Sequence, residues 1–194
     1  MRTLPPVLAA FALLAVAACG PDVYSVTQTR LYSPDTFRLA AGGKRLYTIV
    51  RGNPFGAPRE RTEALVIAAM QRGMLHTDTA LVRRPTFTTD AEAAARPAYR
   101  VALVLNPAQD IDAATLCGDP GGVALAPRAG GGILARMAFC HEARVLSTSR
   151  GELAGVDDPA DHRFRRLIAA MTRQLFPFRD FRDGLGNDGS RTIN

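Results

Sequence analysis

DDPADHRFRRLIAAMTRQL, residues 157–175, decides the fold more than any other stretch of this chain. Asp157 or Asp158 is expected to cap a helix, with Pro159 in its first turn and the sequence 176–178 (Phe-Pro-Phe) after its end. Large apolar residues recur in the stretch at spacings of three and four, which places them on one helix face. They are Phe164, Leu167, Ile168, Met171 and Leu175. Such a face must be buried, and we expect it to pack on a sheet.

The opposite side of this helix is basic, since Arg163, Arg165, Arg166 and Arg173 lie there. Arginine dominates the whole chain: Lys44 is the only lysine among 24 basic side chains, against 18 acidic ones. Arginine suits bidentate contacts with phosphate, so lipopolysaccharide, phospholipid headgroups or an acidic partner are ligands to consider. A GC-rich genome would give the same composition whatever the function, and a solvated helix face is the simpler interpretation.

Three further segments are predicted to be strands and a second helix. Arg45–Arg51 (RLYTIVR) and Tyr99–Leu105 (YRVALVL) are rich in β-branched and apolar residues, and the latter is expected to be central in a sheet. Ile133–Ser149 is long enough for a bent strand or a hairpin arm. Arg59–Arg72 is predicted to be a helix with Gly73 as its C-terminal cap. Its inward-facing residues are expected to be Thr62, Leu65, Val66, Ala69 and Met70.

The remaining segments are less regular. Residues 20–41 are expected to be an extended tether that becomes an edge strand, interrupted by Pro34. Residues 75–97 are expected to hold two short strand pieces, at 80–82 and 86–88, and a surface loop. The glycine- and proline-rich section 110–132 is predicted to be a loop with one short strand at 123–126.

The order of these elements predicts an α+β domain over residues 45–178. In this fold class a largely antiparallel sheet carries two amphipathic helices packed on one face. A chain of 194 residues is long enough for one such domain with a substantial core. Residues 179–194 are polar and glycine-containing, which predicts a flexible C-terminal tail.

The N-terminal segment indicates where the protein resides. Its apolar run closes on Val16-Ala17-Ala18-Cys19, which resembles the lipobox of bacterial lipoproteins. Residues 4–18 are about fifteen residues long, shorter than the roughly twenty of a spanning helix. An ordinary signal peptide is the alternative. The resemblance implies a signal peptide at 1–18, acylation of Cys19, and a lipidated tether over 19–44.

The same resemblance implies a location and a first partner. Acyl chains on Cys19 would hold the protein to a membrane on the periplasmic side of the cell envelope. Gly20, in place of an aspartate after the cysteine, favours the outer membrane by the sorting rule of some enteric bacteria.

Two cysteines remain once Cys19 is set apart. In an oxidising compartment Cys117 and Cys140 are expected to form a disulfide. It would close a loop of about 24 residues and stabilise the fold by about 3 kcal/mol. A metal site built from these cysteines with His141 and Glu142 is a weaker alternative, because the cysteines lack the close spacing of zinc ligands.

Catalytic motifs are not found. His76, His141 and His162 are scattered, and HExxH, GxSxG and SxxK patterns are missing. Gly130–Gly132 lacks the lysine and hydroxyl residue of a phosphate-binding P-loop, which leaves a turn as its expected role. We therefore expect no enzymatic activity, no cofactor and no metal, and nucleic acid is an unsuitable partner for a lipid-anchored periplasmic protein.

One loop is a candidate contact site. Arg51, Asn53 and Phe55 join the first strand to the start of a helix, where anions and partners are often bound. Ordinary turn chemistry at Asn53 and a hydrophobic staple at Phe55 would account for the same residues.

The order of elements over residues 45–176 is similar to that of envelope lipoprotein domains of the uncharacterised DUF4136 type and of lipopolysaccharide-assembly lipoproteins. The leading hypothesis is a non-enzymatic, lipid-anchored periplasmic protein that binds another envelope protein as an assembly or scaffold module. A lipid or lipopolysaccharide binder using Arg163, Arg166 and Arg173 is the second hypothesis, and a periplasmic hydrolase is the third. A basic patch contiguous with an apolar groove would favour the second.

Overall fold

The structure is a computed structural model that describes residues 32–41, 43–75 and 83–177. At its centre is a five-stranded sheet with the order β2-β1-β3-β4-β5. The strands are β1 (Arg45–Arg51), β2 (Thr86–Thr88), β3 (Tyr99–Leu105), β4 (Ile133–His141) and β5 (Arg144–Leu153). The helices are α1 (Pro34–Ala41), α2 (Arg59–Gly73), α3 (Ala113–Gly118) and α4 (His162–Leu175), with a 3-10 turn η1 at Ala129–Gly131.

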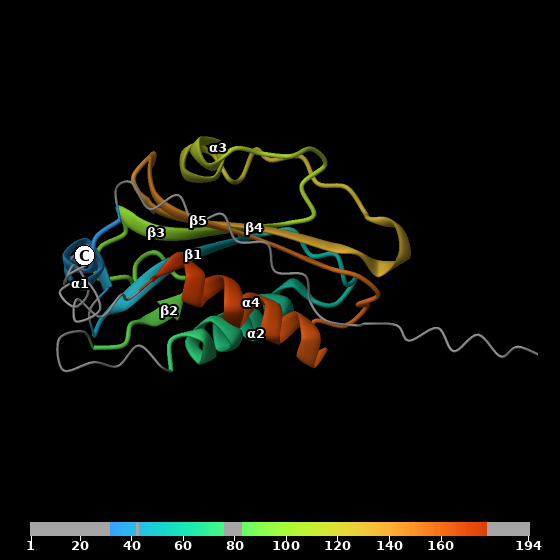
Figure 1. Ribbon diagram of the computed structural model, residues 1–194, viewed down its shortest axis with the longest axis horizontal. Helices are drawn as coiled ribbons and strands as arrows, with labels where there is room; N and C mark the ends of the chain where they lie inside the picture. The colour runs from blue at the N-terminus through green and yellow to red at the C-terminus, as the bar shows by residue number, and fades with distance from the viewer. Residues whose placement is uncertain (1–31, 42, 76–82, 178–194) are drawn as a thin grey trace, which may run out of the picture.

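The predicted α+β class is confirmed. Helices α2 and α4 lie side by side on one face of the sheet, and α3 lies on the other (Figure 1). Strands β3, β4 and β5 pair antiparallel along their lengths and form the larger part of the sheet. Strand β1 pairs parallel with both β2 and β3. A helix follows β1, and a helical crossover is what returns the chain in a parallel direction.

Strand β3 is apolar from Val101 to Leu105 because both of its faces are covered there. Val101, Leu103 and Leu105 belong to the main core beneath α2 and α4. Ala102 and Val104 face the other way, into a smaller core with Leu116, Cys117, Val123, Ala138 and Cys140. A strand buried on both faces has a continuous apolar sequence, which explains why YRVALVL lacks alternation.

Gly73 has a different role from the predicted helix cap. It lies in the last turn of α2, and Met74 is the C-cap residue with a helical backbone conformation. A Cβ atom on Gly73 would lie 2.5 Å from the carbonyl oxygen of Ala169 in α4. The glycine therefore lets the two helices approach closely, and α2 ends against α4.

The edge-strand prediction for residues 34–41 is wrong, because this segment forms α1. The Ser33 hydroxyl accepts a hydrogen bond from the Thr36 backbone N–H at 3.0 Å, as an N-cap residue does. Pro34, which was expected to interrupt a strand, takes the first helical position, where its missing N–H costs nothing. Phe37 is fully buried and its ring centroid lies 4.7 Å from that of Phe176. The earlier part of the predicted tether lies outside the described residues.

The section 110–132 contains α3, where a loop was predicted. The Asp112 carboxylate caps this helix by accepting from the Thr115 backbone N–H at 2.7 Å. The predicted strand at 123–126 is reduced to an isolated bridge between Pro107 and Leu125. Helix α3 is only six residues long, too short to show an apolar period.

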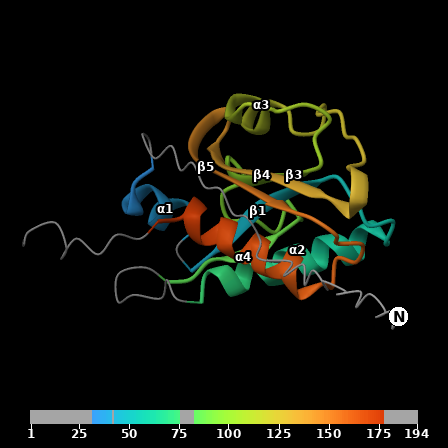
Figure 2. The same cartoon turned by 45° about the vertical axis from the view of Figure 1, so that its right-hand side comes forward.

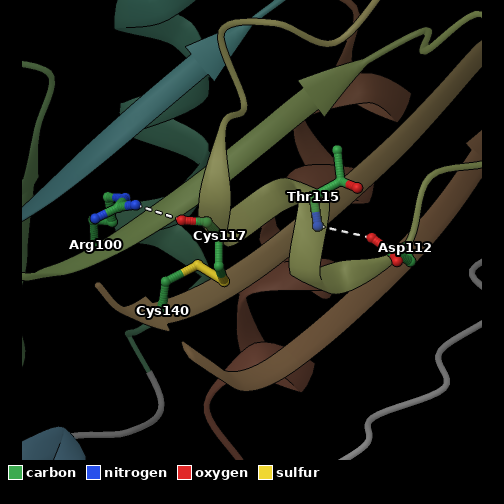
Figure 3. Close-up of a disulfide and its surroundings, with 5 residues drawn as sticks. All are labelled: Arg100, Asp112, Thr115, Cys117 and Cys140. Atoms are coloured by element: carbon green, nitrogen blue, oxygen red, sulfur yellow. Dashed lines mark hydrogen bonds between the residues drawn. A yellow bond between two sulfur atoms is a disulfide. The ribbon is translucent and has the colours of Figure 1, made fainter. Parts of the chain in front are cut away.

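Arginines on the face of the sheet that α3 covers anchor the section 110–132 by polar contacts. Arg100 donates a hydrogen bond to the Cys117 carbonyl oxygen (Figure 3), and Arg136 donates to that of Ile111. Arg136 also forms an ion pair with Asp110 at 3.1 Å. Part of the arginine excess is therefore structural.

The start of α4 lies later than predicted. Asp161 is its N-cap, and its carboxylate accepts from the Arg163 backbone N–H at 2.7 Å. The hydrogen bonds from Arg163 lower the pKa of Asp161, so this cap stays ionised at neutral pH. Asp158 instead accepts from Ala160 N–H in the preceding turn, and Pro159 lies before the helix. The predicted end of the helix before Phe176 is confirmed.

Residues 133–149 form most of a hairpin and not one bent strand. Strands β4 and β5 are joined by a tight turn at Glu142, whose φ of +53° reverses the chain.

Among the described residues no helix is both long and apolar enough to cross a membrane. The predicted tail at 179–194 and the strand piece at 80–82 lie outside the described part of the chain.

Candidate binding site

A cleft lies at the carboxyl ends of the parallel strands β1 and β3. It consists of two adjoining hollows of about 190 and 280 Å³ that share Gly52, Asn53 and Leu125. Arg51 and Arg59 line the first hollow, and Arg128 lines the second. We call it the strand-end cleft. Ligands of α/β proteins are commonly bound at the carboxyl ends of parallel strands.

Two unusual backbone conformations shape the cleft. Gly52 has a φ of +93°, and a Cβ atom there would lie 2.3 Å from the Leu105 carbonyl oxygen. Asn106 has a φ of +53°, and its side chain donates to the Gly132 carbonyl oxygen at 3.0 Å and accepts from Leu134 N–H at 2.7 Å. Gly52 therefore permits the close approach of the ends of β1 and β3, and Asn106 ties the end of β3 to the start of β4.

The triple glycine forms the predicted turn, and the turn is ordered. Gly130 and Gly131 both have positive φ, and their carbonyl oxygens accept hydrogen bonds from Gly155 and Val156 at 3.2 and 3.0 Å. Leu125 also lines the cleft; its side chain is 38% exposed and adds an apolar surface. The cleft thus has basic and apolar parts.

Arg51 carries an unsatisfied hydrogen-bond donor beside the cleft. Its Nε atom is buried and has no hydrogen-bond partner among the described residues. Arg59, by contrast, donates to the Glu63 carboxylate at 2.7 Å. A buried donor without an acceptor is costly, and the Arg51 guanidinium as a whole is suited to a carboxylate or phosphate.

Asn53 and Phe55, the other predicted residues of this loop, have structural roles. The Asn53 amide donates to the Ala57 carbonyl oxygen and accepts from the Thr62 hydroxyl at 3.0 Å, which fixes the loop to the start of α2. The Phe55 ring packs edge-on against Phe164 with centroids 4.8 Å apart. Their side chains are occupied, although the backbone of Asn53 still borders the cleft.

The structure does not bring the predicted arginines of α4 into this cleft. Arg163 is held at the helix start by Asp161 at 2.8 Å and by the Gly155 carbonyl oxygen at 2.6 Å. Arg166 and Arg173 line a separate hollow on the outer side of α4. Sequence reasoning missed Arg59, Arg128 and Leu125, because they come from three distant segments that only the tertiary fold brings together.

The predicted disulfide is confirmed. Cys117 in α3 and Cys140 in β4 are bonded with sulfurs 1.98 Å apart, and both residues are fully buried (Figure 3). Their sulfurs are occupied by each other, so the alternative metal site is unavailable to them. His141 stacks on Tyr99 with ring centroids 4.3 Å apart. Cys19, the predicted acylation site, lies outside the described residues.

Comparisons with known proteins found nothing similar: the chain matches no protein-family model, no curated protein and no solved structure. The lipobox resemblance and the likeness to envelope lipoprotein domains therefore stay predictions from the sequence.

Proposed function

We propose that this chain is a lipid-anchored protein on the periplasmic side of the cell envelope that works by binding another envelope protein and not by catalysis. The observation that carries the binding role is Arg51, which lines the strand-end cleft and whose buried Nε has no hydrogen-bond partner among the described residues. The observation that supports the anchor is the lipobox sequence ending at Cys19.

The anchor proposal agrees with two further properties of the chain. The Cys117–Cys140 disulfide suits the oxidising space outside the inner membrane. The segment between Cys19 and Tyr32 can span about 45 Å when fully extended, so a tethered domain could turn its cleft toward a partner. Gly20 favours the outer membrane as the site of attachment.

The cleft suggests the chemistry of the partner. Arg51 and Arg128 would bind a carboxylate, while Leu125 and the Ala126–Pro127 segment would contact an adjacent apolar side chain. An acidic segment of another protein with a neighbouring apolar residue offers both groups. Assembly and scaffold proteins recognise partners through segments of this kind.

The binding role can be tested by photocrosslinking in cells. A photoreactive amino acid at position 125 of the full chain is expected to form a discrete adduct with an envelope protein, detected by gel shift and identified by mass spectrometry. Arg51→Gln removes a charge-assisted hydrogen bond and is expected to weaken this adduct about tenfold.

Position 91 is a suitable control for the photoreactive group. Ala91 is exposed in a segment that bonds to the first residue of β1, through Ala95 N–H and the Arg45 carbonyl oxygen, at the opposite end of that strand. The same adduct from position 91, or an adduct from position 125 that is indifferent to Arg51→Gln, would show that the cleft is not the binding site. No adduct at all would contradict the binding role.

A further inference from the structure

Helices α2 and α4 cover the same face of the sheet (Figure 2). The separate hollow noted above lies where the end of α2 meets the outer side of α4. We call it the basic groove. Its volume is about 420 Å³. The groove is lined by Arg72 in the last turn of α2, by Leu75 just after that helix, and by Arg165, Arg166, Ala169 and Arg173 on α4.

The alignment of the groove residues along α4 follows from helix geometry. Positions 165, 166, 169 and 173 are separated by one, three and four residues, so they form one stripe along α4. The stripe lies opposite Phe164, Leu167 and Met171, which enter the core. Because Gly73 permits close contact with Ala169, Arg72 and Leu75 on either side of Gly73 are brought to this stripe.

Four arginines and His162 line the groove, and no described acidic side chain does. No described acidic residue pairs with these arginines, although His162 Nδ1 lies 3.5 Å from the Asp161 carboxylate. Arg165 buries its Nε atom without a described hydrogen-bond partner. Elsewhere on the protein Arg59 and Arg150 pair with Glu63 and Glu152. Four like charges around one hollow repel one another, and bound anions would relieve that repulsion.

The groove also has an apolar component. Leu75 is 52% exposed, the highest value among the large hydrophobic residues that the structure describes. Ala169 and Ala170 lie between the arginines. A surface that combines arginines with an exposed leucine is suited to the interface of a membrane, where phosphates lie directly above apolar chains.

We propose that the basic groove binds the phosphate groups of anionic lipid headgroups, with Leu75 entering the interface beside them. The arginines would each contact phosphate oxygens through two N–H groups. The choice of a lipid surface as the occupant rests on the proposed tether, which would keep the domain close to a membrane. The charge and shape of the groove do not depend on that tether.

The test uses residues 19–194 carrying Cys19→Ser, which retains every described residue and removes any contribution from acyl chains. The protein is mixed with phosphatidylcholine vesicles that contain or lack phosphatidylglycerol, and the bound fraction is measured by sedimentation. Binding is expected only with phosphatidylglycerol and should weaken with added salt. The pair Arg166→Gln and Arg173→Gln is expected to weaken it about twenty-five-fold, since each arginine near an anionic surface contributes about fivefold.

The matched control is the pair Arg96→Gln and Arg144→Gln, which makes the same change in net charge at exposed arginines outside the groove. It should retain most of the binding, and equal unfolding midpoints would show that all variants are folded. Equal weakening by both pairs would overturn the proposal, because the attraction would then belong to the whole protein. Complete competition by millimolar inorganic phosphate would show a small-anion site instead.

Absence of vesicle binding would also overturn the proposal. That result would leave the tether and the strand-end cleft untouched, since neither contributes to this measurement. Conversely, vesicle binding by the Cys19→Ser protein would stand even if Cys19 were found unacylated.

Discussion

Gly52→Ala is expected to lower the free energy of unfolding by about 3 kcal/mol, through two costs that add. A φ of +93° is strained for any residue with a Cβ atom. The new methyl group would also lie 2.3 Å from the Leu105 carbonyl oxygen, a backbone atom that cannot move without separating β1 from β3. Urea unfolding followed by circular dichroism measures the loss.

Gly56→Ala is the matched control. Gly56 also has a positive φ of +65°, but nothing lies within 4 Å of the position of its Cβ. It is expected to cost about 1 kcal/mol, from backbone strain alone. If the two variants lose equal stability, the close approach of β1 and β3 at the floor of the strand-end cleft is not what requires Gly52.

The double variant Cys117→Ala and Cys140→Ala is expected to lose about 3 kcal/mol of stability. The bond links residues 23 positions apart, and its removal frees that loop in the unfolded chain. Alanine is chosen because both sites are fully buried in the smaller core, where a serine hydroxyl would need a hydrogen-bond partner. The unfolding midpoint in urea measures the effect.

A reductant provides the control for this prediction. The parent protein, unfolded and refolded with its cysteines reduced, should lose most of the same stability, whereas the double variant should not respond. If reduction leaves the stability of the parent protein unchanged, the disulfide does not stabilise the fold, and the loss in the variant comes from packing alone.

The elements that sequence reasoning placed correctly are those with a long, unambiguous pattern. Residues 101–105 of β3 have no polar interruption because two layers cover them, and the predicted bounds of β1 and β3 are those of the structure. The spacing of apolar residues in α4 is equally clear, because the helix face that carries them is buried in the main core.

The errors arose where the same residue type supports two structures. Pro34 can interrupt a strand or begin a helix, and only the Ser33 cap and the burial of Phe37 favour the helix. Asp157, Asp158 and Asp161 could each cap α4 by their sequence position. The turn in which Asp161 N–H donates to the Asp158 carbonyl oxygen places the cap at Asp161.

The functional surfaces were predictable only in part. Arg51 and the arginine stripe of α4 were visible as local patterns, and both line hollows in the structure. Arg72 and Leu75 belong to the basic groove only because α2 crosses α4 at Gly73, a tertiary contact that no spacing in the sequence encodes. Asn53 and Phe55 both have structural roles, but Phe55 packs on Phe164 of α4, a contact that differs from the expected staple at the start of α2.

Acylation of Cys19 is the central proposal, because it would place the domain at a membrane and give both surfaces their context. The most direct measurement is the mass of the N-terminal peptide of membrane-fractionated protein, compared between the parent chain and Cys19→Ser. The parent chain should begin at Cys19, carry acyl chains and sediment with membranes, as should the Cys117→Ala and Cys140→Ala variant. Cys19→Ser should lack acyl chains and be either released or left unprocessed. An unacylated parent chain, or fractionation and processing unchanged by Cys19→Ser, would contradict the account.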